Sequence, residues 1–166
     1  MTGTLDAFAV WLRATDVSQA ITAVPWLWPA CEIAHFIGLS VLVGVVGFFD
    51  LRLLGFVRGV SLDAAWSLMP WGKAGFGLAA ITGVTFFVGA PEQYVSNVAF
   101  YAKLAFLAVA GVNALCFERL YGAVVKAGSS PDRAPLAYRA IAIVSIVSWF
   151  LVIYWGRMLP FVGNAF

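Results

Sequence analysis

Charged residues are scarce in this chain of 166 residues: Asp, Glu, Lys and Arg make up 11% of it, whereas hydrophobic residues make up 63%. Ordinary soluble domains carry about 25% charged and about 45–50% apolar residues. A chain this short has too little interior to hide so much apolar surface from water. The composition therefore excludes a soluble globular enzyme and a disordered or fibrous chain, and it predicts an integral membrane protein of one domain, residues 1–166.

Positive charge and cysteine are also in short supply. The chain has 10 Lys and Arg against 8 Asp and Glu, a net charge of +2, and such scattered positive charge excludes a nucleic-acid surface. The two cysteines, Cys31 and Cys116, lie far apart, which excludes a disulfide framework and a CxxC pair. The first ten residues contain no Lys or Arg, so we expect no cleavable signal peptide.

Histidine occurs once, at His35. A single histidine excludes a bis-histidine haem within one chain, and its place inside a predicted membrane span leaves no basis for a Ser–His–Asp triad. Glu32 and His35 form one Glu-x-x-His unit, but di-iron bundles use that unit twice together with two further glutamates. No glycine-rich phosphate loop stands out either.

Long apolar segments are what the sequence has in abundance. A membrane helix needs about 20 mostly apolar residues, and four stretches satisfy this: residues 29–54, 65–90, 95–116 and 136–159. Residues 4–20 are shorter and amphipathic, which predicts an interfacial helix rather than a fifth span. The connecting segments are short, so the fold class is predicted as all-α, a four-helix up-down-up-down membrane bundle.

The distribution of basic residues predicts the orientation. We name end A the side of the membrane where the first span begins and the fourth ends, and end B the opposite side. The residues expected at end B are Arg52, Arg58, Lys73, Arg119, Lys126, Arg133 and Arg139, and those at end A are Arg13, Lys103 and Arg157. By the positive-inside rule, end B is cytoplasmic and both termini are periplasmic if the source is a Gram-negative bacterium.

Polar residues inside the spans are costly, so each needs a partner or a function. The antiparallel arrangement predicts two clusters of mixed sign. The end A cluster is Glu32, His35, Lys103 and Arg157; the end B cluster is Asp50, Arg52, Lys73, Asn113, Glu118 and Arg139. Asp50 follows Glu32 by 18 positions, which places both carboxylates on one face of the first helix. That face should point into the bundle.

The end A cluster has several interpretations. His35 could ligate haem b in one of three ways: as a five-coordinate haem, with Met158 as the methionine within reach, or as a haem shared across a dimer. It could instead bind copper or zinc together with Cys31 and Glu32. The plainest alternative is a buried histidine in a structural salt-bridge network.

A further interpretation is a polar pocket for a quinone or a lipid headgroup. Lys103 and Arg157 would offer positive charge to an acidic group, and neighbouring tryptophans would supply stacking walls.

The end B cluster is interpreted as structural. Arg52 would anchor at the headgroups, Gly55 would end the helix, and Asp50 would pair with Lys73 or Arg139. The functional alternative, a proton or ion path from Asp50 to Glu32, finds no polar residue along the intervening face. Asn113 is expected to donate an interhelical hydrogen bond.

Small residues mark a close helix contact. Gly75, Ala79 and Gly83 form a row on one face of the second span, which allows another helix to approach to backbone distance. The partner would be another span of the same chain or a second copy in a homodimer.

Several of these motifs together resemble a known group of proteins. They are Pro29-x-x-Glu32-x-x-His35, Asp50-Leu-Arg-Leu-Leu-Gly55, Asn97-x-x-Phe100-x-x-Lys103, Asn113 and Trp155-Gly-Arg157. From about Trp26 to Arg157 the chain resembles uncharacterised bacterial four-helix inner-membrane proteins, a domain of unknown function. A more distant likeness is to haem-binding four-helix membrane proteins such as the oxidase of late haem synthesis.

Two hypotheses of function follow. The first is a small bacterial inner-membrane protein with a polar ligand site near its periplasmic face, in a haem- or quinone-linked redox role. The second is a non-enzymatic accessory or assembly subunit of a larger membrane complex, in which the polar clusters only hold the bundle together. A transporter ranks below both, because four spans make a small translocation unit and no broken helix is visible.

Overall fold

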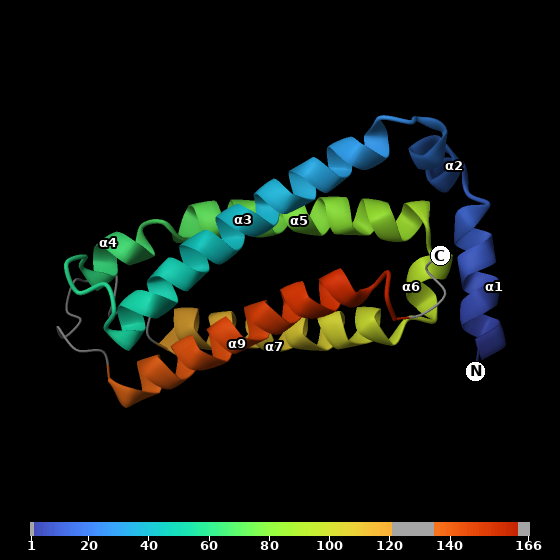
Figure 1. The fold of residues 1–166 in the computed structure, drawn as a ribbon. Helices are drawn as coiled ribbons and strands as arrows, with labels where there is room; N and C mark the ends of the chain where they lie inside the picture. The colour runs from blue at the N-terminus through green and yellow to red at the C-terminus, as the bar shows by residue number, and fades with distance from the viewer. Residues whose placement is uncertain (1, 121–134, 163–166) are drawn as a thin grey trace.

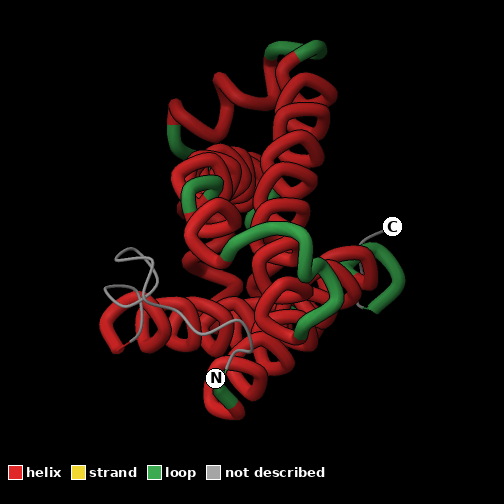
Figure 2. Tube along the Cα trace, turned by 90° about the vertical axis from the view of Figure 1, so that its left-hand side faces the viewer, coloured by secondary structure: helices red, strands yellow, loops and turns green. Residues whose placement is uncertain are grey.

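The computed structural model describes residues 2–120 and 135–162, and this part of the chain is helix and loop without a strand (Figure 2). Four helical segments are long and apolar enough to cross a membrane: Leu27–Leu54, Leu62–Gly89, Val98–Arg119 and Leu136–Met158. The predicted all-α four-helix membrane bundle is confirmed. Lys126 and Arg133, which entered the predicted orientation, lie outside the described residues.

From α1 to α7 the helices follow one another along the chain with short connections (Figure 1). Their bounds are α1 Thr2–Arg13, α2 Asp16–Ala23, α3 Leu27–Leu54, α4 Leu62–Trp66, α5 Met69–Gly89, α6 Glu92–Val95, α7 Val98–Leu120 and α9 Leu136–Met158. The four long helices α3, α5, α7 and α9 alternate in direction, and α1 runs across their end A (Figure 1).

The N-terminal segment forms two helices where one was expected. Thr15 breaks the helix and caps α2, since its backbone is extended and its hydroxyl accepts the Ser18 N–H at 3.3 Å. Arg13 then donates to the Gly89 carbonyl at 2.6 Å, at the C-terminal end of α5. That hydrogen bond fastens the N-terminal helices to the end of the bundle.

Local sequence signals explain where the spans begin and end. Gly55 has φ 91° and ends α3 as expected, because glycine adopts this left-handed conformation without a steric penalty. The second hydrophobic stretch is divided into α4 and α5 just before Pro70, which lies in the first turn of α5 and needs no N–H partner there. The Asn97 side chain accepts the Ala99 N–H at 2.9 Å where α7 begins.

The bundle is built from two helix pairs. Packing is most extensive between α3 and α5 and between α7 and α9; α3 and α9 join the two pairs, and α5 and α7 make few direct contacts. In Figure 1, α3 crosses α5 and α9 crosses α7.

The crossing of α3 over α5 is close because glycines meet there. A Cβ on Gly38 would lie 2.8 Å from the Gly75 carbonyl oxygen, and one on Gly75 would lie 2.7 Å from the Gly38 carbonyl oxygen. Ala79 belongs to the same contact, and Gly83 faces the His35 ring. The predicted row of small residues therefore packs within the chain, against α3.

Candidate functional site

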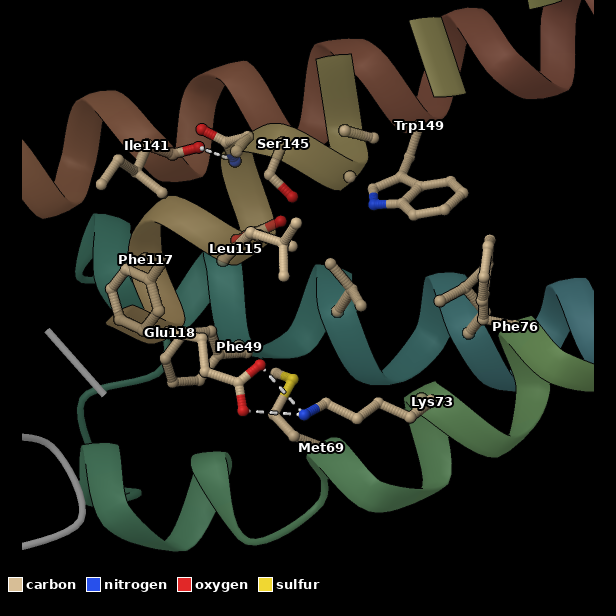
Figure 3. A pocket seen from close by; sticks show the side chains of 18 of the residues that line it. Phe49, Met69, Lys73, Phe76, Leu115, Phe117, Glu118, Ile141, Ser145 and Trp149 are labelled. Carbon is tan, nitrogen blue, oxygen red and sulfur yellow. Dashed lines mark hydrogen bonds and ion pairs between the residues drawn. The ribbon is translucent and has the colours of Figure 1, made fainter. Parts of the chain in front are cut away.

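A cavity of about 340 Å³ lies in the end B half of the bundle, where α5 and α7 separate (Figure 3). Its walls come from the second half of α3, the start of α5, the second half of α7 and the first half of α9, with Trp66 of α4. None of the four residues of the predicted end A cluster lines it. The end B cluster, which was interpreted as structural, contributes Asp50, Lys73, Asn113 and Glu118.

Aromatic side chains form much of the cavity wall. Phe49, Trp66 and Phe117 pack against one another with ring centroids 5.3–5.5 Å apart. Phe76 of α5 and Trp149 of α9 add two further rings to the lining (Figure 3). Such edge-to-face and tilted arrangements stabilise a wall of fixed shape.

Asp50 is the buried acidic group of this cavity. Its side chain is 4% exposed, and the Ser145 hydroxyl of α9 is a hydrogen-bond partner of its carboxyl. Among the described residues its Oδ2 atom has no hydrogen-bond partner. A buried polar atom without a partner costs about 1–3 kcal/mol. A bound molecule that offered this oxygen a hydrogen bond or a positive charge would remove that cost.

The expected pairing of Asp50 with Lys73 or Arg139 is wrong. Lys73 Nζ lies 2.8 Å and 3.0 Å from the two carboxylate oxygens of Glu118, and Arg139 is exposed. Lys73 extends across the gap between α5 and α7 to reach Glu118 (Figure 3). Asp50 instead faces α9, so the two carboxylates do not share the lysine.

Two other residues of the end B cluster hold helices or loops in place. Asn113 donates to the Ile141 carbonyl at 3.1 Å, which confirms it as an interhelical donor between α7 and α9. Arg52 does not anchor at the headgroups as expected, since it is 6% exposed and its Nε donates to the Val60 carbonyl. The chain turns at Gly55 and folds back over Arg52, which explains this difference.

At end A, His35 joins α3 to α5. Its Nδ1 lies 2.8 Å from the Thr82 hydroxyl oxygen, and its ring meets Phe86 edge-on at 5.6 Å. The sequence identified His35 but not Thr82 as its partner. Glu32, one helical turn earlier, is exposed and accepts a hydrogen bond from Trp28 Nε1 at 3.2 Å.

The two basic residues of the end A cluster lie apart from the acidic one. The end of the Lys103 side chain, its Nζ included, lies beside Gly156 of α9. Arg157 is exposed, with its guanidinium carbon 5.1 Å from the centre of the Phe161 ring. Within residues 2–120 and 135–162 the cluster forms no ion pair, so the structural salt-bridge network expected there is not formed by these side chains.

Tyr94 of α6 lies outside the spans, beside end A. Burial raises the pKa of its phenol, and the negative charge of Glu32 raises it further. No group of three or more His, Cys, Asp or Glu side chains that could hold a metal ion occurs in the part of the chain that is described. The expected copper or zinc site of Cys31, Glu32 and His35 therefore gains no support.

Ser145 and Trp149, like the rings of Phe49, Trp66, Phe76 and Phe117, are site residues that the sequence did not identify. A signal for Ser145 was present: the buried positions of α9 include Tyr138, Ala142, Ser145 and Val152, which recur at intervals of three, four and seven. This spacing marks one face of a helix. A serine on that face is directed toward the bundle.

No family model, curated protein or solved structure matches this chain. Function therefore has to be inferred from the cavity and the polar groups themselves.

Proposed function

We propose that this multi-pass membrane protein binds an amphiphilic small molecule in the cavity between α5 and α7. The observation that carries the proposal is the Asp50 carboxyl oxygen, which is buried against the cavity without a hydrogen-bond partner among the described residues. Ligand sites are mostly apolar with a few well-placed polar groups. Apolar walls with one unsatisfied polar group fit a ligand that has an apolar body and a polar head.

The arrangement of the helices supports access from the lipid. Because α5 and α7 make few direct contacts, the apolar body of a bilayer-dissolved ligand can pass between them. The Lys73–Glu118 ion pair spans this gap and gives the opening a polar edge. A quinone or a lipid belongs to the class of molecules that this geometry can receive.

The cellular setting is part of the same proposal. The chain would lie in a bacterial inner membrane with end B, and so the cavity, toward the cytoplasm and both termini in the periplasm. The excess of basic residues expected at end B supports this orientation. The ligand site would then lie near the cytoplasmic face rather than near the periplasmic face expected from the end A cluster.

The absorption spectrum of the purified protein tests separately whether His35 ligates haem. Its Nδ1 is directed to Thr82, which leaves Nε2 as the ring nitrogen for a metal. A Soret band that disappears in His35→Ala would assign haem b to this residue. Colourless protein from haem-replete cells would leave His35 as a contact between α3 and α5.

The proposed function is tested by photolabelling in lipid nanodiscs with azioctanol, a neutral alcohol that carries a photoreactive diazirine. We expect adducts on the cavity-lining part of α7, residues 107–118. Gly111 lines the cavity, and a Cβ there meets no described atom within 4 Å. Gly111→Leu should therefore fill the cavity and abolish these adducts.

Gly77→Leu is the matched control, because a Cβ at Gly77 also meets no atom of the described residues within 4 Å and Gly77 does not line the cavity. Equal labelling of the two variants and the wild type would contradict the proposal. If the cavity stays unlabelled and the protein co-purifies with a larger complex, the accessory-subunit hypothesis is favoured instead.

A further inference from the structure

We propose that the ligand of this cavity is a lipophilic cation, an organic molecule whose positive charge is surrounded by apolar groups. This inference rests on the proposed function, and it narrows the ligand from any amphiphile to one class. Three features of the cavity carry it: the balance of charge on its lining, its aromatic walls and its size.

The described side chains that line the cavity carry a net charge of −1 when their acidic groups are ionised. Among the described residues, three ionisable side chains line the cavity: Asp50, Lys73 and Glu118. Lys73 and Glu118 neutralise each other at 2.8 Å. Asp50 remains without a counter-charge among the described lining residues, and an isolated charge in an apolar environment is costly unless it is paired.

Two further basic residues in the described part of end B, Arg52 and Arg139, do not supply that counter-charge. Arg52 follows Asp50 by two positions, which turns its side chain about 200° around α3, and its Nε is engaged with the Val60 carbonyl. Arg139 of α9 is exposed and does not line the cavity. A positively charged ligand would therefore complete the pairing of Asp50.

The aromatic walls favour the same class. The face of an aromatic ring is negative and attracts a cation within about 6 Å of its centre, most strongly when water is excluded. Phe49, Trp66, Phe76, Phe117 and Trp149 all line the cavity. Rings and a carboxylate together bind an organic cation, whereas an anionic amphiphile would be repelled by Asp50.

The volume limits what can be enclosed. About 340 Å³ lies at the small end of the range of roughly 300–1,000 Å³ for ligand pockets. The charged head and the apolar groups attached to it fill such a space. A longer chain would extend between α5 and α7 into the lipid.

Equilibrium dialysis with radiolabelled tetraphenylphosphonium tests the inference on the full chain in nanodiscs of zwitterionic lipid. Tetraphenylborate has nearly the same shape and the opposite charge. We expect saturable binding of the cation, at about one per chain, and no saturable binding of the anion. This contrast needs no substitution, so it does not depend on whether a variant folds.

Two substitutions then locate the binding. Asp50→Asn should weaken tetraphenylphosphonium binding by at least about tenfold, since it removes the charge partner from a buried site. Asp50→Glu, which keeps the charge, should remain within a few-fold of wild type. Asp63→Asn is the control, because Asp63 is an exposed carboxylate of α4 that does not line the cavity.

The outcomes separate the two proposals. Binding of the anion as tight as that of the cation, or wild-type affinity in a folded Asp50→Asn variant, would overturn the cation inference. Labelling of the cavity by azioctanol without binding of tetraphenylphosphonium would also overturn it, and the proposed function would stand. If neither probe occupies the cavity, both proposals fail.

Discussion

Adding one methyl group at Gly38 should separate α3 from α5. In Gly38→Ala the new Cβ would lie 2.8 Å from the Gly75 carbonyl oxygen and 2.9 Å from the Ala79 backbone nitrogen. Ordinary contacts of a Cβ begin at 3.4 Å. The helices would have to move apart by about 0.6 Å, the difference between 3.4 and 2.8, because both obstacles are backbone atoms that cannot rotate away.

The size of the effect follows from two opposing terms. Overpacking a well-packed contact costs about 1–3 kcal/mol, partly because a gap of 0.5–1 Å forfeits a quarter to a half of the dispersion energy at the interface. Replacing glycine by alanine within a helix returns about 0.5–1 kcal/mol. We therefore expect Gly38→Ala to lower the free energy of unfolding by about 1 kcal/mol, within limits of about 0 and about 2.5 kcal/mol.

Gly44→Ala is the matched control on the same helix, since no atom in the described part of the chain lies within 4 Å of a Cβ at Gly44. Both variants share the gain in helix propensity, so the difference between them isolates the steric term, about 1–3 kcal/mol. The measurement is reversible unfolding in mixed micelles titrated with sodium dodecyl sulfate, followed by circular dichroism. Equal stability of Gly38→Ala and Gly44→Ala would refute the close backbone crossing.

The double variant Gly38→Ala/Gly75→Ala sharpens the test. One separation of the helices relieves both new methyl groups, because Gly38 and Gly75 oppose each other at the same crossing. The second substitution should therefore cost much less than the first. Additive losses would mean that the two glycines act at independent contacts.

Three further predictions concern single contacts. In a double-mutant cycle of His35→Ala and Thr82→Val, the coupling free energy should be about 0.6 kcal/mol and at most about 1.7 kcal/mol, as for hydrogen bonds between membrane helices. A coupling free energy of zero would contradict the 2.8 Å contact between His35 Nδ1 and the Thr82 hydroxyl. Lys73→Met should lower the free energy of unfolding by less than about 1 kcal/mol, because the Lys73 side chain is 64% exposed. A larger loss would show that the Lys73–Glu118 ion pair stabilises more of the bundle than the opening of the cavity. In an ultraviolet titration, burial and the charge of Glu32 should make Tyr94 ionise above the ordinary tyrosine pKa; Glu32→Gln should lower that pKa, and Tyr94→Phe should remove the late-titrating group.

Features that depend on local sequence could be predicted. Gly55 ends α3 because a left-handed residue is needed after the last turn, and glycine is the residue that adopts this conformation freely. Asn113 donates to α9 because a polar amide within an apolar span must find an acceptor on a neighbouring helix. The row from Gly75 to Ala79 indicated a close crossing, although its partner could not be identified from spacing alone.

Features that depend on how the helices are rotated and spaced could not be predicted. Glu32 and Arg157 belong to the same end of the bundle, yet each has a local partner, Trp28 for the first and Phe161 for the second. Lys73 reaches Glu118 of α7 rather than Asp50, although α5 and α7 make few direct contacts. The cavity lies between these two helices, and the sequence has no local signal for their spacing.

The division of the bundle into two helix pairs bears on how the protein is made. Each closely packed pair, α3 with α5 and α7 with α9, consists of consecutive spans. The first pair, α3 with α5, can therefore enter the membrane as a helical hairpin whose contacts are complete before α7 and α9 have been synthesised, and α7 with α9 can follow as a second hairpin. The contact between α3 and α9 is the step that requires the whole chain, and the ligand cavity comes into being only at that step.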